Sequence, residues 1–130
     1  MKRILLSLLI SLGIITSAIA QDIKEPAPKI YMQVTTVESV IGGGLGRSKL
    51  IVTNPDGSQK ESEMNNLFSL VGINFKNIKE NEVQIIKILK TYTDEGWKLE
   101  QVIPLTLSPS DNGQGIFMTR YLLSRPDSKK

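Results

Sequence analysis

The residues of this chain that could carry acid–base chemistry are carboxylates, which occur in three close pairs. Two neighbouring carboxylates can act as general acid and general base when burial raises the pKa of one of them. Each pair lies in a polar stretch near an expected helix end, where no desolvated setting is indicated. The pairs are Glu61 with Glu63, Glu80 with Glu82, and Asp94 with Glu95. We therefore expect no catalytic residue. The alternative hypothesis is that the protein is a small enzyme that depends on carboxylates.

The sequence contains neither histidine nor cysteine. This excludes triads with a histidine base, thiolate nucleophiles, and zinc or iron sites that use imidazole or thiolate ligands. Disulfides within the chain are excluded as well. We expect no metal site and no cofactor.

A glycine-rich segment at residues 42–46 resembles phosphate-binding loops in composition. A Walker loop places a glycine five residues before the glycine of its Gly-Lys-Ser/Thr end. In this chain Gly46 would require a glycine at the position of Ile41, and a strand rather than a helix is expected to follow. We interpret the segment as a hairpin loop.

Four side chains are weak candidates for contact with a ligand. An exposed aromatic ring can stack on a sugar or a base. Trp97, however, directly follows a helix-ending glycine, so we interpret it first as a core residue. Aromatic residues make up only 5% of the chain, which argues against a carbohydrate platform. The candidates are Trp97, Tyr92, Tyr121 and Arg120.

The helix before Trp97 is defined by its spacing and its ends. Asn77 or Asn81 is expected to cap its start, and Gly96 to end it in the left-handed conformation. This geometry predicts a contact between Trp97 and Tyr92. The apolar stripe of the helix consists of Ile85, Ile88, Leu89 and Tyr92, widened by Val83 and Ile86.

Alternating apolar residues predict strands at residues 30–41 and 48–53, joined as a hairpin by the glycine loop. A turn follows at residues 54–57, where proline and glycine stand at favoured positions. The next segment, 58–71, has apolar residues at helical spacing, and a short strand at 68–75 is the competing interpretation. Its helical face would be formed by Met64, Leu67, Phe68 and Val71.

A third strand is expected from Trp97 and a fourth at residues 116–124, after a loop at 108–115. Pro104 should end the third strand or mark it as an edge strand. The fourth strand is apolar on both faces, which indicates a central strand or a dimer interface. One face of the third strand is expected to carry Trp97, Leu99, Ile103 and Leu105.

These elements predict an α+β fold: a small antiparallel sheet of four strands in two hairpins, with one or two helices packed on one face. The single domain should span residues 30–125. A polar, proline-containing leader at 21–29 precedes it, and a polar tail at 126–130 follows it. The second sheet face has no evident cover, so it is solvated or builds a homodimer.

Residues 1–20 are expected to form a signal peptide. Lys2 and Arg3 precede an apolar run, and the small-x-small ending favours cleavage between Ala20 and Gln21. Without this segment the net charge falls from +3 to +1, which gives no footprint for nucleic acid. We expect a periplasmic or secreted protein with no stable membrane span after cleavage. A membrane-tethered structural protein that retains the segment is the alternative.

Residues 85–125 resemble domain-of-unknown-function family 4177 and its exported relatives in Bacteroidetes-type bacteria. The resemblance rests on Asp94-Glu95-Gly96-Trp97-Lys98-Leu99, Val102-Ile103-Pro104 and Tyr121-Leu122-Leu123-Ser124-Arg125. It implies a helix that ends in Gly-Trp, then two strands, and it implies no activity. This chain departs from the family pattern in Lys98 and in the long connection at 54–79.

Composition, missing residue types and export together favour a non-catalytic binding or assembly module of the cell envelope. Its partner would be an envelope protein, a small ligand or a second copy of the chain.

Overall fold

The computed structural model describes residues 27–41, 47–107 and 115–127. The expected signal peptide, its cleavage site at Ala20 and Gln21, and most of the two predicted loops lie outside these residues. Five long strands, a small hairpin and one helix make up the described chain. They are β1 (Lys29–Ser39), β2 (Ser48–Thr53), β3 (Gln59–Met64), β4 (Phe68–Ser69), β5 (Gly72–Ile73), α2 (Phe75–Asp94), β6 (Lys98–Leu107) and β7 (Ile116–Pro126).

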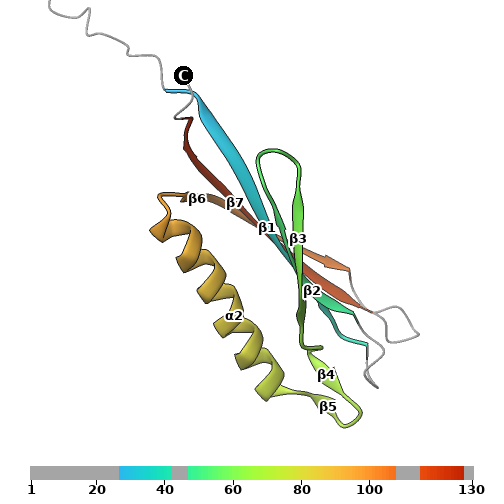
Figure 1. Cartoon of the computed structure of the whole chain (residues 1–130). Helices are drawn as coiled ribbons and strands as arrows, with labels where there is room; N and C mark the ends of the chain where they lie inside the picture. The colour runs from blue at the N-terminus through green and yellow to red at the C-terminus, as the bar shows by residue number, and fades with distance from the viewer. Residues whose placement is uncertain (1–26, 42–46, 108–114, 128–130) are drawn as a thin grey trace, which may run out of the picture.

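The long strands form one antiparallel sheet in the order β3-β2-β1-β7-β6, and β4 pairs with β5 separately. Figure 1 shows α2 lying across one face of the sheet, with the β4–β5 hairpin at the end where the helix begins. The α+β class and both predicted hairpins, β1–β2 and β6–β7, are confirmed. The sheet has five strands rather than four. The apolar strand β7 lies inside it, between β1 and β6.

The predicted helix at residues 58–71 is wrong, because its first half forms strand β3. The tight turn before it, in which Gly57 donates its N–H to the Asn54 carbonyl (2.9 Å), directs the chain back along β2. The charged residues of β3 then face water or pair across the strands, as Lys49 does with Glu61. Only Met64 at the strand end is buried. The competing strand interpretation is borne out in part, by β4 and β5.

Helix α2 begins two residues before the first predicted cap. The Asn74 side chain accepts a hydrogen bond from the Asn77 N–H (3.2 Å) and caps the helix. Asn81, predicted as an alternative cap, lies within the helix and is buried. Val83 and Ile86 were expected to widen the buried stripe, but they are 61% and 65% exposed. They lie on the side of the helix that faces away from the sheet.

The helix ends as predicted. Gly96 has a φ of +86°, which is a left-handed conformation that glycine adopts without a steric penalty. Its N–H donates to the Thr93 carbonyl (3.0 Å), and the Trp97 N–H donates to the Tyr92 carbonyl (3.0 Å). These two bonds are those of a Schellman motif. They satisfy carbonyls of the last turn and turn the chain into β6.

Strand β6 departs from the predicted alternation. A register shift between Leu99 and Gln101 leaves Glu100 unpaired on the bulged strand. Leu99 therefore lies opposite Leu123, on the helix side, whereas Ile103 and Leu105 share the opposite face. Pro104 does not end the strand; β6 is an edge strand, which is where proline is tolerated.

The core lies between α2 and the sheet. Ile85, Ile88 and Tyr92 of the helix pack against side chains from four strands and from the helix end. Burial of these apolar side chains is the main force that holds helix and sheet together. The fully packed members are Met32, Val34, Leu50, Val52, Met64, Trp97 and Leu123.

Candidate functional site

The four predicted ligand-contacting residues are distributed over two faces of the sheet. Trp97 and Tyr92 line one cavity of about 340 Å³ at the end of α2, together with Arg125. Trp97 is only 5% exposed and belongs to the core. Its ring is covered by Arg125, whose guanidinium carbon lies 4.4 Å from the ring centroid. With one face taken by Arg125, the indole offers no free stacking platform.

The two candidate tyrosines stay protonated near neutral pH. Burial, with a smaller contribution from the charge of Glu95, raises the pKa of Tyr92 above its usual value. Burial also raises the pKa of Tyr121, with a smaller contribution from Glu38. Because both pKa values are raised, neither phenol is ionised at neutral pH, and neither can act as a base there.

Tyr121 and Arg120 are neighbours in β7, so they point to opposite faces of the sheet. Tyr121 lies opposite Val34 and packs against the core, on the helix side. Arg120 lies opposite Thr35 and Ile103 on the other face. The fold therefore brings Tyr121 to the same side as Trp97 and Tyr92, and separates Arg120 from them.

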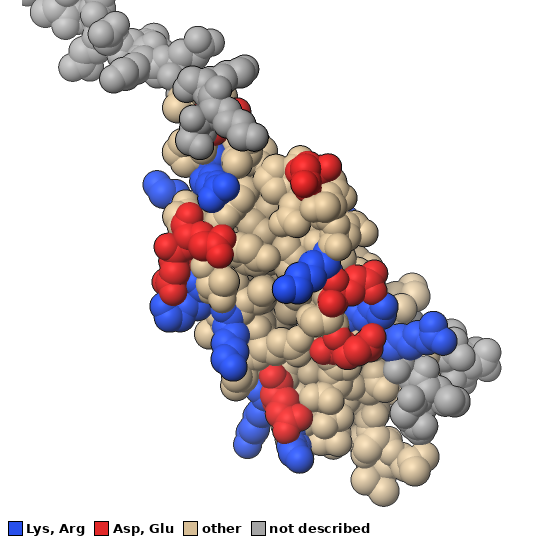
Figure 2. Space-filling model, in the orientation of Figure 1, with Lys and Arg blue, Asp and Glu red and all other residues tan. Residues whose placement is uncertain are grey.

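The carboxylate pairs named from the sequence engage in surface contacts. Glu61 pairs with Lys49, Asp94 pairs with Lys90 (2.7 Å), and Glu80 accepts a hydrogen bond from the Asn65 side chain (3.0 Å). Surface pairs of this kind contribute little to stability and leave the carboxylates solvated. No group of three potential metal ligands occurs among the residues that the structure describes. Figure 2 shows acidic and basic side chains interspersed over the face that carries α2.

The face of the sheet away from α2 carries exposed apolar side chains, among them Leu105 and Leu107. The pairing registers place one row of side chains across five strands on this face, from Glu63 through Lys49, Val37 and Met118 to Leu105. Its acidic end lies on β3 and its apolar end on β6 and β7. We call this surface the open sheet face. No helix of the described chain covers it.

A shallow groove of about 320 Å³ lies at the apolar end of the open sheet face. Its lining side chains come from the paired strands β6 and β7. Leu107 is among the more exposed of them, at 67%. The residues that line the groove are Leu105, Thr106, Leu107, Ile116, Met118 and Arg120. Only Arg120 among these residues was a candidate from the sequence, although the two apolar faces of β7 predicted a central strand or an interface.

Both edges of the sheet are poor places for another strand to pair. Pro104 interrupts the series of N–H donors along the edge strand β6. At the opposite edge, β3 presents Lys60, Glu61 and Glu63. Proline and charge on edge strands oppose edge-to-edge pairing. Association by the face of the sheet is therefore favoured over extension of the sheet.

Among the described residues, no helix is long and apolar enough to cross a membrane. A comparison with family models, curated proteins and solved structures finds no match for this chain.

Proposed function

We propose that this chain is an exported, non-catalytic assembly module of the bacterial cell envelope, and that its open sheet face packs against a second copy. The observation that supports the proposal most is the apolar end of that face, which the described chain leaves uncovered between two blunted edges. Contiguous apolar surface on a small domain is typical of an interaction site. Two antiparallel sheets packed face to face, about 10 Å apart, bury such surfaces in each other.

Charge distribution favours a second copy as the occupant. Glu63 and Arg120 both lie on the open sheet face, and neither forms an ion pair within the described residues. A two-fold axis parallel to the strands lays β3 of one copy over β6 and β7 of the other. The acidic strand then lies above the side of the face that holds Arg120. A two-fold interface repeats each such attraction twice, so a self-complementary face is the expected signature.

Export is supported by the sequence of residues 1–20, and the assembly role by the residue types that the chain lacks. Intact mass spectrometry of the product from the native host tests export directly. We expect the mass of a chain that begins at Gln21. The mass of a chain that begins at Met1 would support the membrane-tethered alternative instead.

Sedimentation velocity of the purified chain tests the assembly. We expect a dimer at micromolar concentration, and monomers for Leu105→Glu and Met118→Glu, because a buried unpaired carboxylate opposes packing of the two faces. The matched controls are Val83→Glu and Ile86→Glu, which place the same charge on the outer side of α2 and should leave the dimer intact.

A charge reversal separates a specific interface from general stickiness. Arg120→Glu is expected to weaken the dimer, and Glu63→Lys in the same chain should restore it in part. A wild-type chain that stays monomeric at high concentration contradicts the proposal. So does a dimer that the helix variants disrupt and the sheet variants do not.

A further inference from the structure

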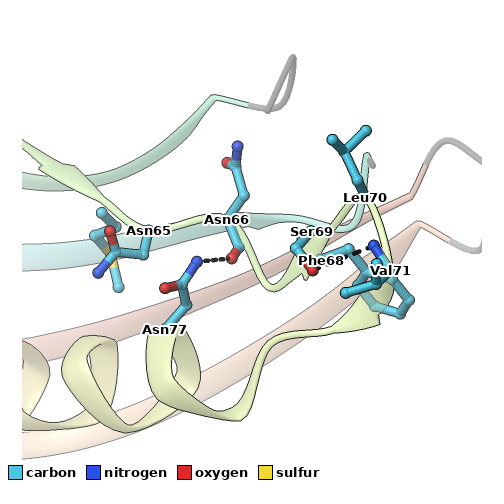
Figure 3. A pocket seen from close by; sticks show the side chains of 8 residues that line it. Asn65, Asn66, Phe68, Ser69, Leu70, Val71 and Asn77 are labelled. Carbon is cyan, nitrogen blue, oxygen red and sulfur yellow. Dashed lines mark hydrogen bonds between the residues drawn. The ribbon is translucent and has the colours of Figure 1, made fainter. Parts of the chain in front are cut away.

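A second cavity lies at the opposite end of α2 from Trp97, between the first turns of the helix and the β4–β5 hairpin. Its volume is about 540 Å³. Figure 3 shows asparagine side chains and the apolar side chains of the hairpin around it. None of the described side chains that line it is charged. The residues that matter here are Asn65, Asn66, Asn77, Phe68, Leu70 and Val71. We call this cavity the hairpin cleft.

The fold fixes one end of two of these amides and leaves the other end available. The Ser48 hydroxyl donates to Asn66 Oδ1 (3.0 Å) and itself accepts from the Ser39 N–H (2.9 Å). Asn77 Nδ2 donates to the Asn66 backbone carbonyl (2.8 Å). Neither Asn66 Nδ2 nor Asn77 Oδ1 bonds to another described residue. The cleft thus offers a held donor and a held acceptor, and groups fixed before binding lose little entropy when a ligand arrives.

The apolar side of the hairpin cleft is unusually open. Leu70 and Val71, at the tip of the hairpin, are 88% and 97% exposed. In Figure 3 the amide of Asn66 and the side chain of Leu70 rise on the same side of the chain. Strands β4 and β5 are only two residues each and, within the described chain, pair with each other alone. Their outer backbone edges are therefore available to an extended ligand.

We infer that the hairpin cleft binds an extended, uncharged peptide segment. In an extended peptide, the carbonyl of one peptide bond can accept from Asn66 Nδ2, and the N–H of a different peptide bond can donate to Asn77 Oδ1. Apolar side chains of the peptide would lie against Phe68, Leu70 and Val71. Peptides commonly bind in this way, through backbone hydrogen bonds along an edge and side chains in apolar contacts.

The lining of the cleft argues against other ligand classes. A charged ligand would meet no oppositely charged side chain among the lining residues. A sugar would find one aromatic ring there, that of Phe68, which is partly buried. The inference does not depend on the dimer, because the open sheet face and the hairpin cleft consist of different residues.

The test is an array of capped pentapeptides with and without charged residues, probed with the purified chain. Each peptide that binds is then titrated in solution, and so is its backbone N-methylated form. We expect the peptides that bind to be uncharged. N-methylation of their backbone should lower the binding affinity about tenfold, because backbone hydrogen bonds are lost. Leu70→Asp and Val71→Asp should also weaken binding at least tenfold. Both residues are on the surface, so the variants should keep the wild-type circular dichroism.

The matched control is Val83→Asp, an exposed apolar residue replaced by the same acid on α2. It should bind the peptides as the wild type does. The inference is overturned if no pentapeptide binds, or if N-methylated or charged peptides bind equally well. Binding of maltotriose in place of peptides overturns it too. The inference is also overturned if no peptide binds and the chain instead binds phosphatidylglycerol vesicles, with Leu70→Asp abolishing that binding.

Discussion

The guanidinium carbon of Arg125 lies 4.4 Å from the centroid of the Trp97 ring, at the junction of α2, β6 and β7. This contact joins the end of β7 to Trp97, the residue after the helix-ending Gly96. A cation over the face of an indole is attracted by the ring, and the aliphatic part of arginine adds packing. The same contact explains why Trp97 is a structural residue rather than a stacking platform for a ligand.

Arg125→Ala should lower the free energy of unfolding by about 1 kcal/mol, because it removes both the cation–π attraction and the cover over the indole. Urea denaturation followed by the fluorescence of the single tryptophan measures this loss. Arg125→Lys should recover part of it, since an ammonium is also attracted to the ring. Lys79→Ala, on the outer side of α2, serves as control and should leave stability unchanged.

Gly96→Ala should destabilise the protein by about 1 kcal/mol, the cost of a left-handed conformation for a residue with a Cβ. No described atom lies within 4 Å of the position that a Cβ would take, so steric conflict adds nothing. Gly96→Asn should cost less, because asparagine tolerates this conformation. Thermal unfolding of the two variants shows which of them loses more stability. Equal losses for alanine and asparagine would show that the conformation is not the cause.

The parts of the fold that were predictable are those encoded over short distances. Gly96 and Trp97 carry the helix end in two adjacent residues, and the turn at residues 54–57 is similarly local. Strand β3 was missed because the apolar residues from Met64 to Val71 have helical spacing, whereas the pairing of β3 with β2 is a tertiary effect that overrides local preference. The bulge at Glu100 also comes from pairing with β7, which no periodicity within β6 records.

The candidate sites were less predictable than the fold. Arg120 and Tyr121 were both candidates for ligand contact, although neighbouring strand residues point to opposite faces of the sheet. The hairpin cleft was not predicted at all. It depends on Asn66 and Asn77 meeting across the β4–β5 hairpin, and an asparagine gives the same sequence signal in a loop, a cap or a cleft.

Asn81→Leu should cost about 2 kcal/mol, because it leaves buried polar groups without partners. The Asn81 side chain accepts from the Asn65 N–H (2.9 Å) and donates to the Asn65 carbonyl (2.8 Å) and to Glu38 (3.0 Å). Gln84→Leu is the matched control, since its bonds to Ser62 and Glu63 are exposed. It should cost less than 0.5 kcal/mol, roughly the usual limit for surface changes. Chemical denaturation measures the free energy of unfolding of both variants. Similar losses for Asn81→Leu and Gln84→Leu would contradict the role of burial.

Glu100 should make stability fall in acid. Hydrogen bonds from Lys29 and Ser124 hold the pKa of the Glu100 carboxyl below its usual value. Its stabilising effect is therefore fully present above the unfolded pKa of about 4.3 and is lost as the pH falls through the lower, folded pKa. Glu100→Gln should flatten this acid limb when the melting temperature is followed against pH. Glu82→Gln is the control, and parallel curves for wild type and Glu100→Gln would contradict the assignment.

Thr36→Val should stabilise the protein. Thr36 is 1% exposed, and its hydroxyl has no hydrogen-bond partner among the described residues. It lies on the helix side of β1, opposite Leu50 and Thr119. A buried hydroxyl without a partner costs about 1 kcal/mol or more, and valine has nearly the same shape without that cost. Differential scanning calorimetry should therefore show a higher melting temperature. Thr53→Val, which removes an acceptor for the Gln59 side chain at an accessible position, should show no such gain. A lower melting temperature for Thr36→Val would mean that the hydroxyl is satisfied in solution.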